Sequence, residues 1–388
     1  MIHRTISQYL THVASKFPVV VLTGPRQSGK TTLVEKLFSY KAYVSLEDPD
    51  VRDFALTDPR GFLNQYKEGA IIDEAQNVPS LFSYIQTRVD QSKKDGEFVL
   101  TGSQNFSLVE GISQSLAGRA AVAHLLPLSI EELISDNETV ENPFTFIQKG
   151  FYPRVYDKNI PATDWFKSYI NTYLERDVRK ITNIYDLSKF QLFLKLCAGR
   201  IGQLLNMSSL ASDCGVTHST INSWISILEA SFVVFLLRPH HKNFNKRLVK
   251  QPKLYFYDTG LASHLLGLHK SEDLVSHYMR GALFENFVVA DLIKQRYNQG
   301  RESNLNFWRD NHGHEVDVVI SAGENLIPLE IKSSQTISSE QFKSLSYWYE
   351  LTGKKNDGYL VYAGNASQER TMGRVMSWKD LYKINNSS

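Results

Sequence analysis

The chain has 388 residues, 42% of them hydrophobic, and a formal net charge of +2 at pH 7, so it is long enough for two to four domains, each with its own core. The small net charge excludes a uniformly basic protein, and a nucleic-acid surface would have to be a local patch. The two cysteines, Cys197 and Cys214, lack metal-ligand spacing, which argues against a zinc site or a disulfide framework and for a reducing compartment.

The first chemical motif is GPRQSGKT, residues 24–31, which fits the phosphate-binding pattern G-x-x-x-x-G-K-[ST]. An apolar run before it predicts a buried strand, and the residues after it predict a helix with one apolar face. In that context backbone N–H groups and a helix N-terminus would cradle phosphates, whereas a chance glycine-rich turn would lack such flanks. Lys30 would reach the β and γ phosphates, and the Thr31 hydroxyl would hold Mg²⁺. The residues expected to bind ATP are Gly24, Pro25, Arg26, Gln27, Ser28, Gly29, Lys30, Thr31 and Thr32.

A second apolar run ends in Asp73 and Glu74, which is the Walker B pattern of a buried strand with an acid pair at its carboxyl end. Asp73 would hold Mg²⁺ through water, and Glu74 would polarise the attacking water. A third run, 98–100, is followed by Ser103 and Gln104. One of these two, lying between the first two strands, would contact the γ phosphate or the attacking water. The alternative is an ordinary strand-to-loop turn.

Strands that alternate with helices predict a parallel sheet with helices on both faces, and further strands are expected at 43–46 and 122–126. Arg119 follows the third run. It would neutralise charge on the γ phosphate, in its own chain or in a neighbour's, or else be an ordinary surface arginine, and both interpretations stay open. Arg26, inside the loop, is a second candidate for the same role.

These motifs resemble one family of AAA+-type ATPases, which in bacteria and archaea is fused to a C-terminal domain of unassigned function. The resemblance implies that the chain binds ATP and hydrolyses it, but it supplies no cellular role. It covers nearly the whole chain and rests on the segments at 24–33, 72–76, 100–103, 116–119, 150–155 and 173–178.

A polar segment at 135–143 marks a boundary, and a helical, aromatic-rich segment follows it. AAA+-type proteins carry a small helical lid over the nucleotide at this place. The charge cluster at 175–180 is interpreted as a solvated helix face, with a contact to the nucleotide or to a neighbouring subunit as the alternative.

From 204 to 258 we predict a winged helix, because two short helices are followed by two apolar strands. Its second helix presents no arginine, so we expect shape or backbone binding of DNA over recognition of base sequence. A winged helix used for protein contacts is the alternative. No acidic residue occurs between Glu229 and Asp258, and the wing between the two strands carries Arg238, His240, His241, Lys242, Lys246, Arg247 and Lys250.

The C-terminal part predicts a helix, three strands, a helix and a strand, and Asp317 followed by Glu330-x-Lys332 is the pattern of the PD-(D/E)XK nucleases. Adjacent strands would place Asp317 beside Glu330, and the two-residue period of a strand puts Lys332 on the same face. With Glu285 from the helix and the carbonyl of Ile331, the carboxylates would hold Mg²⁺ or Mn²⁺. Lys332 would orient the attacking water or stabilise the charged transition state. Carboxylates that are structural, or that only bind DNA, are the alternative.

The sequence therefore predicts an α/β protein. It would have a P-loop parallel-sheet ATPase core at 1–135, a helical lid at 136–200, a winged helix at 201–260 and a restriction-endonuclease-like α/β domain at 270–388. The expected function is ATP-gated action on DNA, with a cutting site of Glu285, Asp317, Glu330 and Lys332. A signalling or scaffold ATPase that binds a protein partner without cleaving is the alternative.

The expected partners and location follow from the same observations. ATP would bind the core, and DNA would bind the winged helix and its basic wing. Homo-oligomers are left open, and a ring would require Arg119 to act between chains. The N-terminus does not resemble a signal peptide, and no apolar run approaches the ~20 residues that span a bilayer, so we expect a cytoplasmic protein without a membrane partner.

Overall fold

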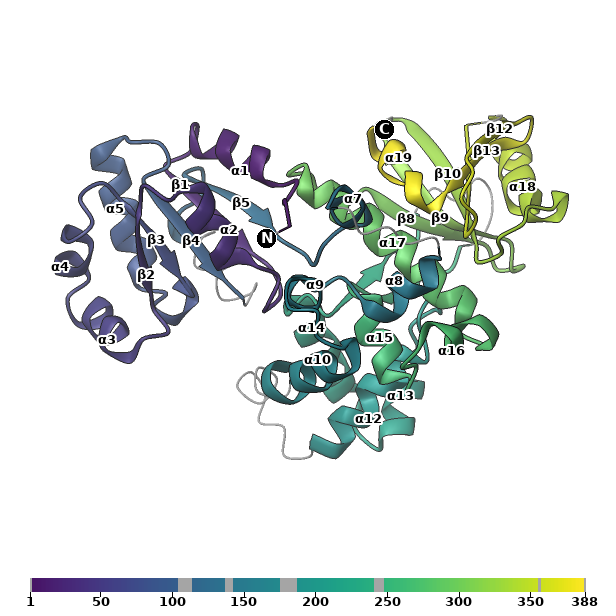
Figure 1. Cartoon of the computed structure of the whole chain (residues 1–388), viewed down its shortest axis with the longest axis horizontal. Coiled ribbons are helices and arrows are strands. Elements are labelled where there is room, and N and C mark those ends of the chain that lie inside the picture. The colour runs from purple at the N-terminus through teal and green to yellow at the C-terminus, as the bar shows by residue number, and fades with distance from the viewer. Residues whose placement is uncertain are drawn as a thin grey trace. The chain divides into compact units, whose positions relative to one another are not determined.

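The structure is a computed structural model of the chain (Figure 1), and it describes residues 2–103, 114–136, 142–174, 187–240, 248–354 and 357–386. The chain divides into two compact units. The first comprises Met1–Leu128, Ala230–Phe232 and Tyr297–Arg301, and the second comprises Ser129–Glu229, Val233–Arg296 and Glu302–Ser388. Among the described helices, none combines the length and the apolar character that crossing a bilayer requires.

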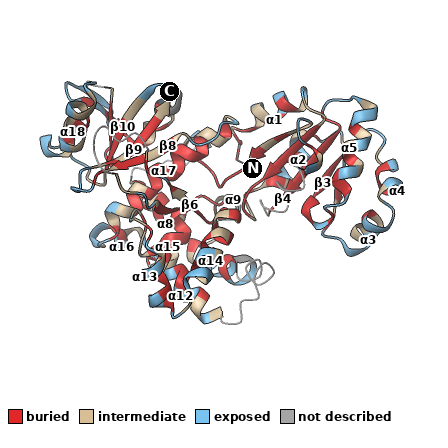
Figure 2. Ribbon diagram, turned by 180° about the vertical axis from the view of Figure 1, so that it is seen from behind, coloured by how far each residue is buried: buried red, intermediate tan, exposed pale blue. Residues whose placement is uncertain are grey.

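A five-stranded sheet forms the centre of the first unit, with the order β2-β3-β4-β1-β5, and each pair of neighbours is parallel. Successive residues of β1 belong to different apolar clusters: Val19 and Val21 pack on one face, Val20 and Leu22 on the other. A sheet covered on both faces needs continuous apolar strands. The three central strands β1, β3 and β4 are buried throughout, as Figure 2 shows for β3 and β4. The strands are β1 (Val19–Thr23), β2 (Ala42–Ser45), β3 (Ala70–Asp73), β4 (Phe98–Gly102) and β5 (Ala120–His124).

This topology confirms the predicted parallel sheet and places β4 between β1 and β3, as the sequence indicated. The parallel direction brings the carboxyl ends of these three strands to the same edge of the sheet. The helices of the unit are α1 (Ser7–Ala14), α2 (Lys30–Leu37), α3 (Pro49–Thr57), α4 (Pro59–Asn64), the short η1 (Ala75–Asn77) and α5 (Leu81–Ser92).

The second unit contains a six-stranded mixed sheet with the order β12-β13-β11-β10-β9-β8. β8, β9 and β10 are antiparallel, whereas β10, β11 and β13 are parallel. The predicted order of helix, three strands, helix and strand is confirmed, and β12, β13 and a last helix follow it. The elements are α17 (Arg280–Asn298), β8 (Leu305–Arg309), β9 (Glu315–Ala322), β10 (Asn325–Lys332), η3 (Ser339–Phe342), α18 (Lys343–Thr352), β11 (Tyr359–Tyr362), β12 (Gln368–Arg370), β13 (Gly373–Ser377), η4 (Trp378–Asp380) and α19 (Tyr382–Asn386).

The middle of the chain is helical up to a two-stranded antiparallel ribbon of β6 and β7. The first strand of this ribbon begins only at Val234, because Phe232 has a φ of 55° and so leaves the extended conformation. The elements are α7 (Ile130–Ser135), α8 (Pro143–Lys149), α9 (Pro153–Asp157), α10 (Ala162–Tyr169), the π-helix η2 (Ile170–Leu174), α12 (Leu187–Ala198), α13 (Met207–Cys214), α14 (His218–Ala230), β6 (Val234–Leu237), β7 (Lys253–Phe256), α15 (Thr259–Leu265) and α16 (Ser271–Ser276).

Two helices and a ribbon thus occur in the predicted order, but the winged helix as a domain, like the lid, stays a prediction. Some of the residues discussed for these two predictions lie outside the described part of the chain. The charge cluster at 175–180 lies there, as do His241, Lys242, Lys246 and Arg247 of the basic wing.

Helix α17 is the central support of the second unit. Its sequence predicts an amphipathic helix, but the structure buries it on almost every side, polar positions included. The side-chain amide of Asn286 accepts from the N–H of Phe256 at 2.8 Å and donates to its carbonyl at 2.7 Å, so it pairs with β7 as a neighbouring strand would. Asp291 accepts from the N–H of Ile130 at 2.7 Å, at the start of α7. Buried polar groups require such partners, and here they join α17 to elements far away in the sequence.

The segment at 150–155, one of those on which the family resemblance rests, has a packing role. Gly150 ends α8 with a φ of 72°, and the N–H of Phe151 donates to the Asp258 carboxylate at 2.7 Å. A Cβ at position 150 would lie 2.6 Å from Asp258 Oδ1 and 2.7 Å from a ring carbon of Phe166. Only glycine satisfies both the backbone angle and the close contact.

We expect Gly150→Ala to destabilise the second unit by about 2–5 kcal/mol, because it combines left-handed backbone strain with overpacking. The matched control is Gly215→Ala. Gly215 also has a positive φ, 62°, but a Cβ there would meet nothing within 4 Å, so about 1–2 kcal/mol is expected. Chemical denaturation of both variants measures the difference, and equal losses would show that the contacts around Gly150 are not restrictive.

Candidate functional site

The loop at 24–31 lies between β1 and α2, where the sequence placed it. Gly24 has a φ of 154°, and a Cβ there would lie 2.1 Å from the carbonyl oxygen of Leu125. Gly29 has a φ of 92° and immediately precedes α2, while Gln27, a residue with a side chain, has a φ of 65°. Backbone held in this region is costly and often marks a functional turn. The loop therefore has the tight curvature that lets backbone N–H groups converge.

Lys30 is the first residue of α2 and is buried. Its ammonium donates to the carbonyl oxygens of Gly24 at 3.0 Å and of Pro25 at 2.9 Å. The side chain therefore lies folded over the loop. Thr32 lies exposed in the first turn of the same helix.

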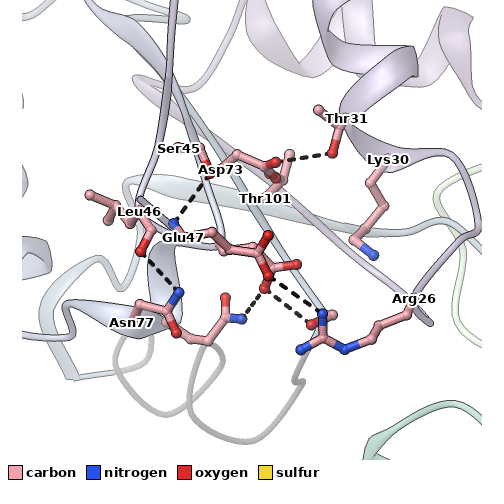
Figure 3. Close-up of polar contacts among 12 residues, drawn as sticks. Arg26, Lys30, Thr31, Ser45, Leu46, Glu47, Asp73, Asn77 and Thr101 are labelled. Atoms are coloured by element: carbon pink, nitrogen blue, oxygen red, sulfur yellow. Dashed lines mark hydrogen bonds and ion pairs between the residues drawn. The ribbon is translucent and has the colours of Figure 1, made fainter. Parts of the chain in front are cut away.

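Asp73 is held at the carboxyl end of β3 by hydroxyl groups from three other elements, of which Figure 3 shows Thr31 and Thr101. Thr31 in α2 donates to its Oδ2 at 3.1 Å, and Tyr43 in β2 donates to the same atom at 2.9 Å. Thr101 in β4 donates to Oδ1. Burial, and then the nearby Asp73 carboxylate, raises the pKa of Tyr43 above its ordinary value, so the phenol keeps the proton that it donates. Sequence reasoning missed Tyr43 and Thr101, although both are polar residues on strands next to β3.

Glu74 follows with a φ of 52°, a left-handed angle that is uncommon for a residue with a side chain. Ser103, buried just after β4, donates to Glu74 Oε2 at 3.1 Å, and the Gln76 amide donates to the same oxygen. Ser103 is thus in contact with the acid pair, while Gln104, the other candidate, lies outside the described residues. Arg26 lies 3.7 Å from Glu47 in an ion pair (Figure 3).

These residues fit a nucleotide with Mg²⁺. The Thr31 hydroxyl and the Asp73 carboxylate, 3.1 Å apart, are hard oxygen donors of the kind that Mg²⁺ binds. Nearby, the buried hydroxyls of Thr23 and Ser28 have no hydrogen-bond partner within the described part of the chain. Buried polar groups without partners are rare, and they are expected where a ligand or water completes a site.

Arg119 lies at the opposite end of the sheet, by the amino ends of β1 and β5. Its carbonyl accepts from the N–H of Val19 at 3.2 Å, at the start of β1, and it directly precedes β5. Its guanidinium pairs with both oxygens of Asp90, at 2.6 and 2.9 Å, and these hydrogen bonds lower the pKa of Asp90. The phosphate loop, in contrast, leaves the carboxyl end of β1, so the structure does not bring Arg119 and the loop together. A role toward a neighbouring chain stays a prediction.

In the second unit, β9 and β10 bring the predicted C-terminal residues together. Asp317 and Glu330 adjoin the paired residues Val318 and Leu329. The N–H of Ile331 donates to Asp317 Oδ2 at 2.8 Å, and Lys332 forms an ion pair with Glu330. The expected side-by-side placement is thus confirmed.

A buried lysine that sequence reasoning missed, Lys253 of β7, completes this cluster. Its ammonium lies 3.1 Å from Glu285 Oε1 and also pairs with Glu315, and the Tyr255 hydroxyl donates to the same Glu285 oxygen. Burial acts to lower the pKa of Lys253, but the neighbouring carboxylates outweigh it and raise the pKa overall, so the group stays charged. A lysine at the start of the apolar run 254–256 of a predicted strand was the available signal.

The predicted metal site of Glu285, Asp317 and Glu330 is not found. Among the described residues, no group of three or more histidine, cysteine, aspartate or glutamate side chains is arranged to hold a metal ion. The physical reason is that Glu285 is engaged by Lys253 and Tyr255, so lysine ammonium groups supply the positive charge.

Two glutamates of this cluster have raised pKa values, the buried Glu330 and the partly buried Glu285. Burial raises the pKa of Glu330 to about 8, with Asp317 acting in the same direction and Lys332 against it. Burial also raises the pKa of Glu285 to about 7, against the effect of Lys253. Glu330 Oε2 is buried without a hydrogen-bond partner in the described structure. That oxygen fits a proton or a cation.

Three family matches cover most of the chain. Residues 16–134 match a family described as an AAA domain, and residues 141–272 and 280–381 match two domains of unknown function. Two relatives, the uncharacterized proteins Mb2031c of Mycobacterium bovis and Rv2008c of Mycobacterium tuberculosis, are each 30% identical over 338 residues, which is 86% of this chain and 75% of theirs. Among solved structures, the Walker-type ATPase PABY2304 of Pyrococcus abyssi is similar with a TM-score of 0.46 and 13% identity, over 67% of this chain and 94% of that one.

We expect Lys253→Met to destabilise the second unit by about 3–5 kcal/mol, because it leaves the partly buried carboxylates of Glu285 and Glu315 without the buried ammonium that pairs with both. The matched control is Lys343→Met: Lys343 lies the same 3.1 Å from its partner Glu340, but both side chains are exposed, so a change within about 0.5 kcal/mol is expected. Urea denaturation compares the two variants. Similar small losses would mean that the buried pairs contribute no more than a surface pair.

Proposed function

This chain belongs to the same family as the mycobacterial proteins Mb2031c and Rv2008c, and we propose that it binds ATP with Mg²⁺ and hydrolyses it as a P-loop ATPase of the AAA type. One observation carries the proposal. Thr31 of the phosphate loop and Asp73 of the neighbouring strand end are in hydrogen-bond contact, with Lys30 and Glu74 directly beside them in sequence. A phosphate loop, two side chains suited to bind Mg²⁺ and a carboxylate suited to accept a proton thus lie at the same end of the sheet.

Mg²⁺, when bound with ATP, neutralises charge on the β and γ phosphates. Lys30 would exchange its contacts with the Gly24 and Pro25 carbonyls for phosphate oxygens, and Thr31 and Asp73 would hold the metal. Asp73 is already oriented by its hydroxyl donors, so little reorganisation is needed when the site fills. Glu74, fixed by Ser103, would accept a proton from the attacking water.

We expect Lys30→Ala to lose ATP binding, because the ammonium supplies the direct charge contact to the phosphates. We expect Glu74→Gln to bind ATP as the parent does but to hydrolyse it about 10²–10⁴-fold more slowly, because only the proton acceptor is removed. Equilibrium binding of a fluorescent ATP analogue and phosphate release measure the two effects. Lys36→Ala, an exposed change on the same helix, is the control. Normal ATP binding by Lys30→Ala would refute the site.

Action on DNA is the second part of the proposal. Its support is the helix pair α13–α14 followed by the β6–β7 ribbon, together with the stretch from Glu229 to Asp258, which contains no acidic residue. DNA backbone binding requires this kind of local positive charge. The proposed divisions are an ATPase core at 1–135, a lid at 136–200, a winged helix at 201–260 and a nuclease-like domain at 270–388. The alternative is an ATPase that binds a protein partner through the last two.

Cleavage of DNA by the C-terminal cluster is a candidate activity that a specific observation favours. Glu330 Oε2 is buried and meets no donor in hydrogen-bond geometry among the described residues, although, against the effect of burial, the Ser344 hydroxyl acts to lower the pKa of this carboxyl group. Asp317 lies beside it and Lys332 on the same strand. A cation such as Mg²⁺ or Mn²⁺ would satisfy that oxygen. Glu285 would join as a ligand only by exchanging its contact with Lys253.

The DNA proposal is tested with branched and linear DNA, with Mg²⁺ or Mn²⁺, and with and without ATP. We expect binding that weakens steeply as salt increases, because phosphate contacts release counterions. If the cluster cuts, Asp317→Ala and Glu330→Ala lose cleavage while Lys30→Ala retains DNA binding. Binding that ignores salt would refute contact with DNA, and cleavage that survives both alanine variants would refute the cutting site.

A further inference from the structure

Arg4 is an arginine buried beside the phosphate loop, 5% exposed. It comes shortly before α1, and none of the sequence motifs includes it. Its Nη1 donates to the carbonyl of Ser28 at 2.8 Å, and its Nη2 donates to the carbonyl of Leu126 at 2.7 Å. A buried guanidinium is costly to desolvate unless its donors are well placed. The two prongs of this side chain therefore connect the loop to the segment that follows β5.

That segment also supports the beginning of the loop. Leu125 donates its N–H to the carbonyl of Thr23 at 2.8 Å, and its own carbonyl oxygen would lie only 2.1 Å from a Cβ on Gly24. The loop is thus fixed at its start by Leu125 and at Ser28 by Arg4. Both supports reach the loop from residues distant in the sequence.

The contact with Ser28 has a geometric consequence. The carbonyl of Ser28 and the N–H of Gly29 belong to one planar trans peptide unit, so they point in opposite directions. A donor that holds the carbonyl on the Arg4 side therefore directs the N–H of Gly29 to the other side. Gly29 is the N-cap residue of α2, with a φ of 92°. In a phosphate loop, N–H groups at this position contact the α and β phosphates.

We propose that Arg4 is a positioning residue of the nucleotide site, which orients the Ser28–Gly29 peptide so that its N–H faces the phosphates of the bound nucleotide. This rests on the proposed ATP site and deepens it. Arg4 acts through the backbone, so it contributes equally to any nucleotide that carries a β phosphate. It contributes nothing that depends on the γ phosphate or on the metal.

The experiment compares Arg4→Gln and Arg4→Lys with the parent, using the full chain. Arg4→Gln should weaken ATP and ADP binding by the same factor, about tenfold or more. The reason is that the Gly29 N–H would lose its hydrogen bond to a charged phosphate, and such a bond is worth at least that ratio. The kcat at saturating ATP should change little, because the lost contact is the same in the ground and transition states. Arg4→Lys keeps the charge but not the fork that spans two carbonyls, so it should recover only part of the affinity.

Arg88→Gln is the matched control. Arg88 in α5 also donates to a backbone carbonyl, that of Lys67, at 3.0 Å, and to the Glu97 carboxylate at 2.9 Å, but these residues precede β3 and β4 at the other edge of the sheet. Arg88→Gln should lower stability but bind ADP with the same affinity as the parent. The amide signal of Gly29 in a two-dimensional NMR spectrum is the second readout, and it should shift in Arg4→Lys even if Arg4→Gln does not fold.

The outcomes separate the two proposals. If the parent binds neither ATP nor ADP, the nucleotide site itself is refuted. If the parent binds both and the Arg4 variants bind as well as it does, only the role of Arg4 is refuted. The role of Arg4 is also refuted if its variants lose ATP binding but keep ADP binding. It is refuted as well if Arg88→Gln, at equal stability, loses as much nucleotide affinity as the Arg4 variants do.

Discussion

The parallel alignment of β3, β4 and β1 is the constraint on which the first unit depends. Three chain segments separated by tens of residues end at one edge of the sheet, because parallel strands share a direction and a register. The phosphate loop leaves β1 there, the acid pair leaves β3, and Ser103 leaves β4. Asp73 and Thr31 therefore come within hydrogen-bond distance without any further structural element. The edge strand β2 adds Tyr43 to the same carboxylate. One geometric rule thus positions nearly every residue of the nucleotide site.

The second unit uses buried charge where the first uses hydroxyl groups. Helix α17 carries Glu285 toward Lys253 and, one residue later, Asn286 toward the backbone of Phe256. Both contacts end on β7, so the helix and the ribbon are joined by an ion pair and an amide pair side by side. Buried ion pairs contribute little net stability relative to apolar packing, but each partner makes the other indispensable. Glu285, which resembles a metal ligand in the sequence, is therefore paired with Lys253 in the structure.

The family motif at 150–155 shows that a conspicuous sequence pattern need not mark chemistry. Its glycine is required by the approach of Asp258 and Phe166, and its next residue donates to the same aspartate. Burial raises the pKa of Asp258, whereas Lys294 and several backbone N–H groups oppose that effect. The segment is therefore a packing junction, and no site role is needed to explain it.

Local pattern alone determined the phosphate loop, the Walker B pair, and the order of strands and helices in the C-terminal part, because turns, strand periods and strand-end acids are written in consecutive residues. It also placed Asp317 beside Glu330, since the short turn at 323–324 fixes the register of the two strands and the two-residue period puts both side chains on the same face. Arg119, Arg4, Tyr43 and Lys253 depended on the tertiary structure. Each acts on a partner from another part of the chain, and which edge or element a side chain meets is set by long-range register. Proximity in sequence gave no sign that Arg119 pairs with Asp90 or that Arg4 lies against the loop.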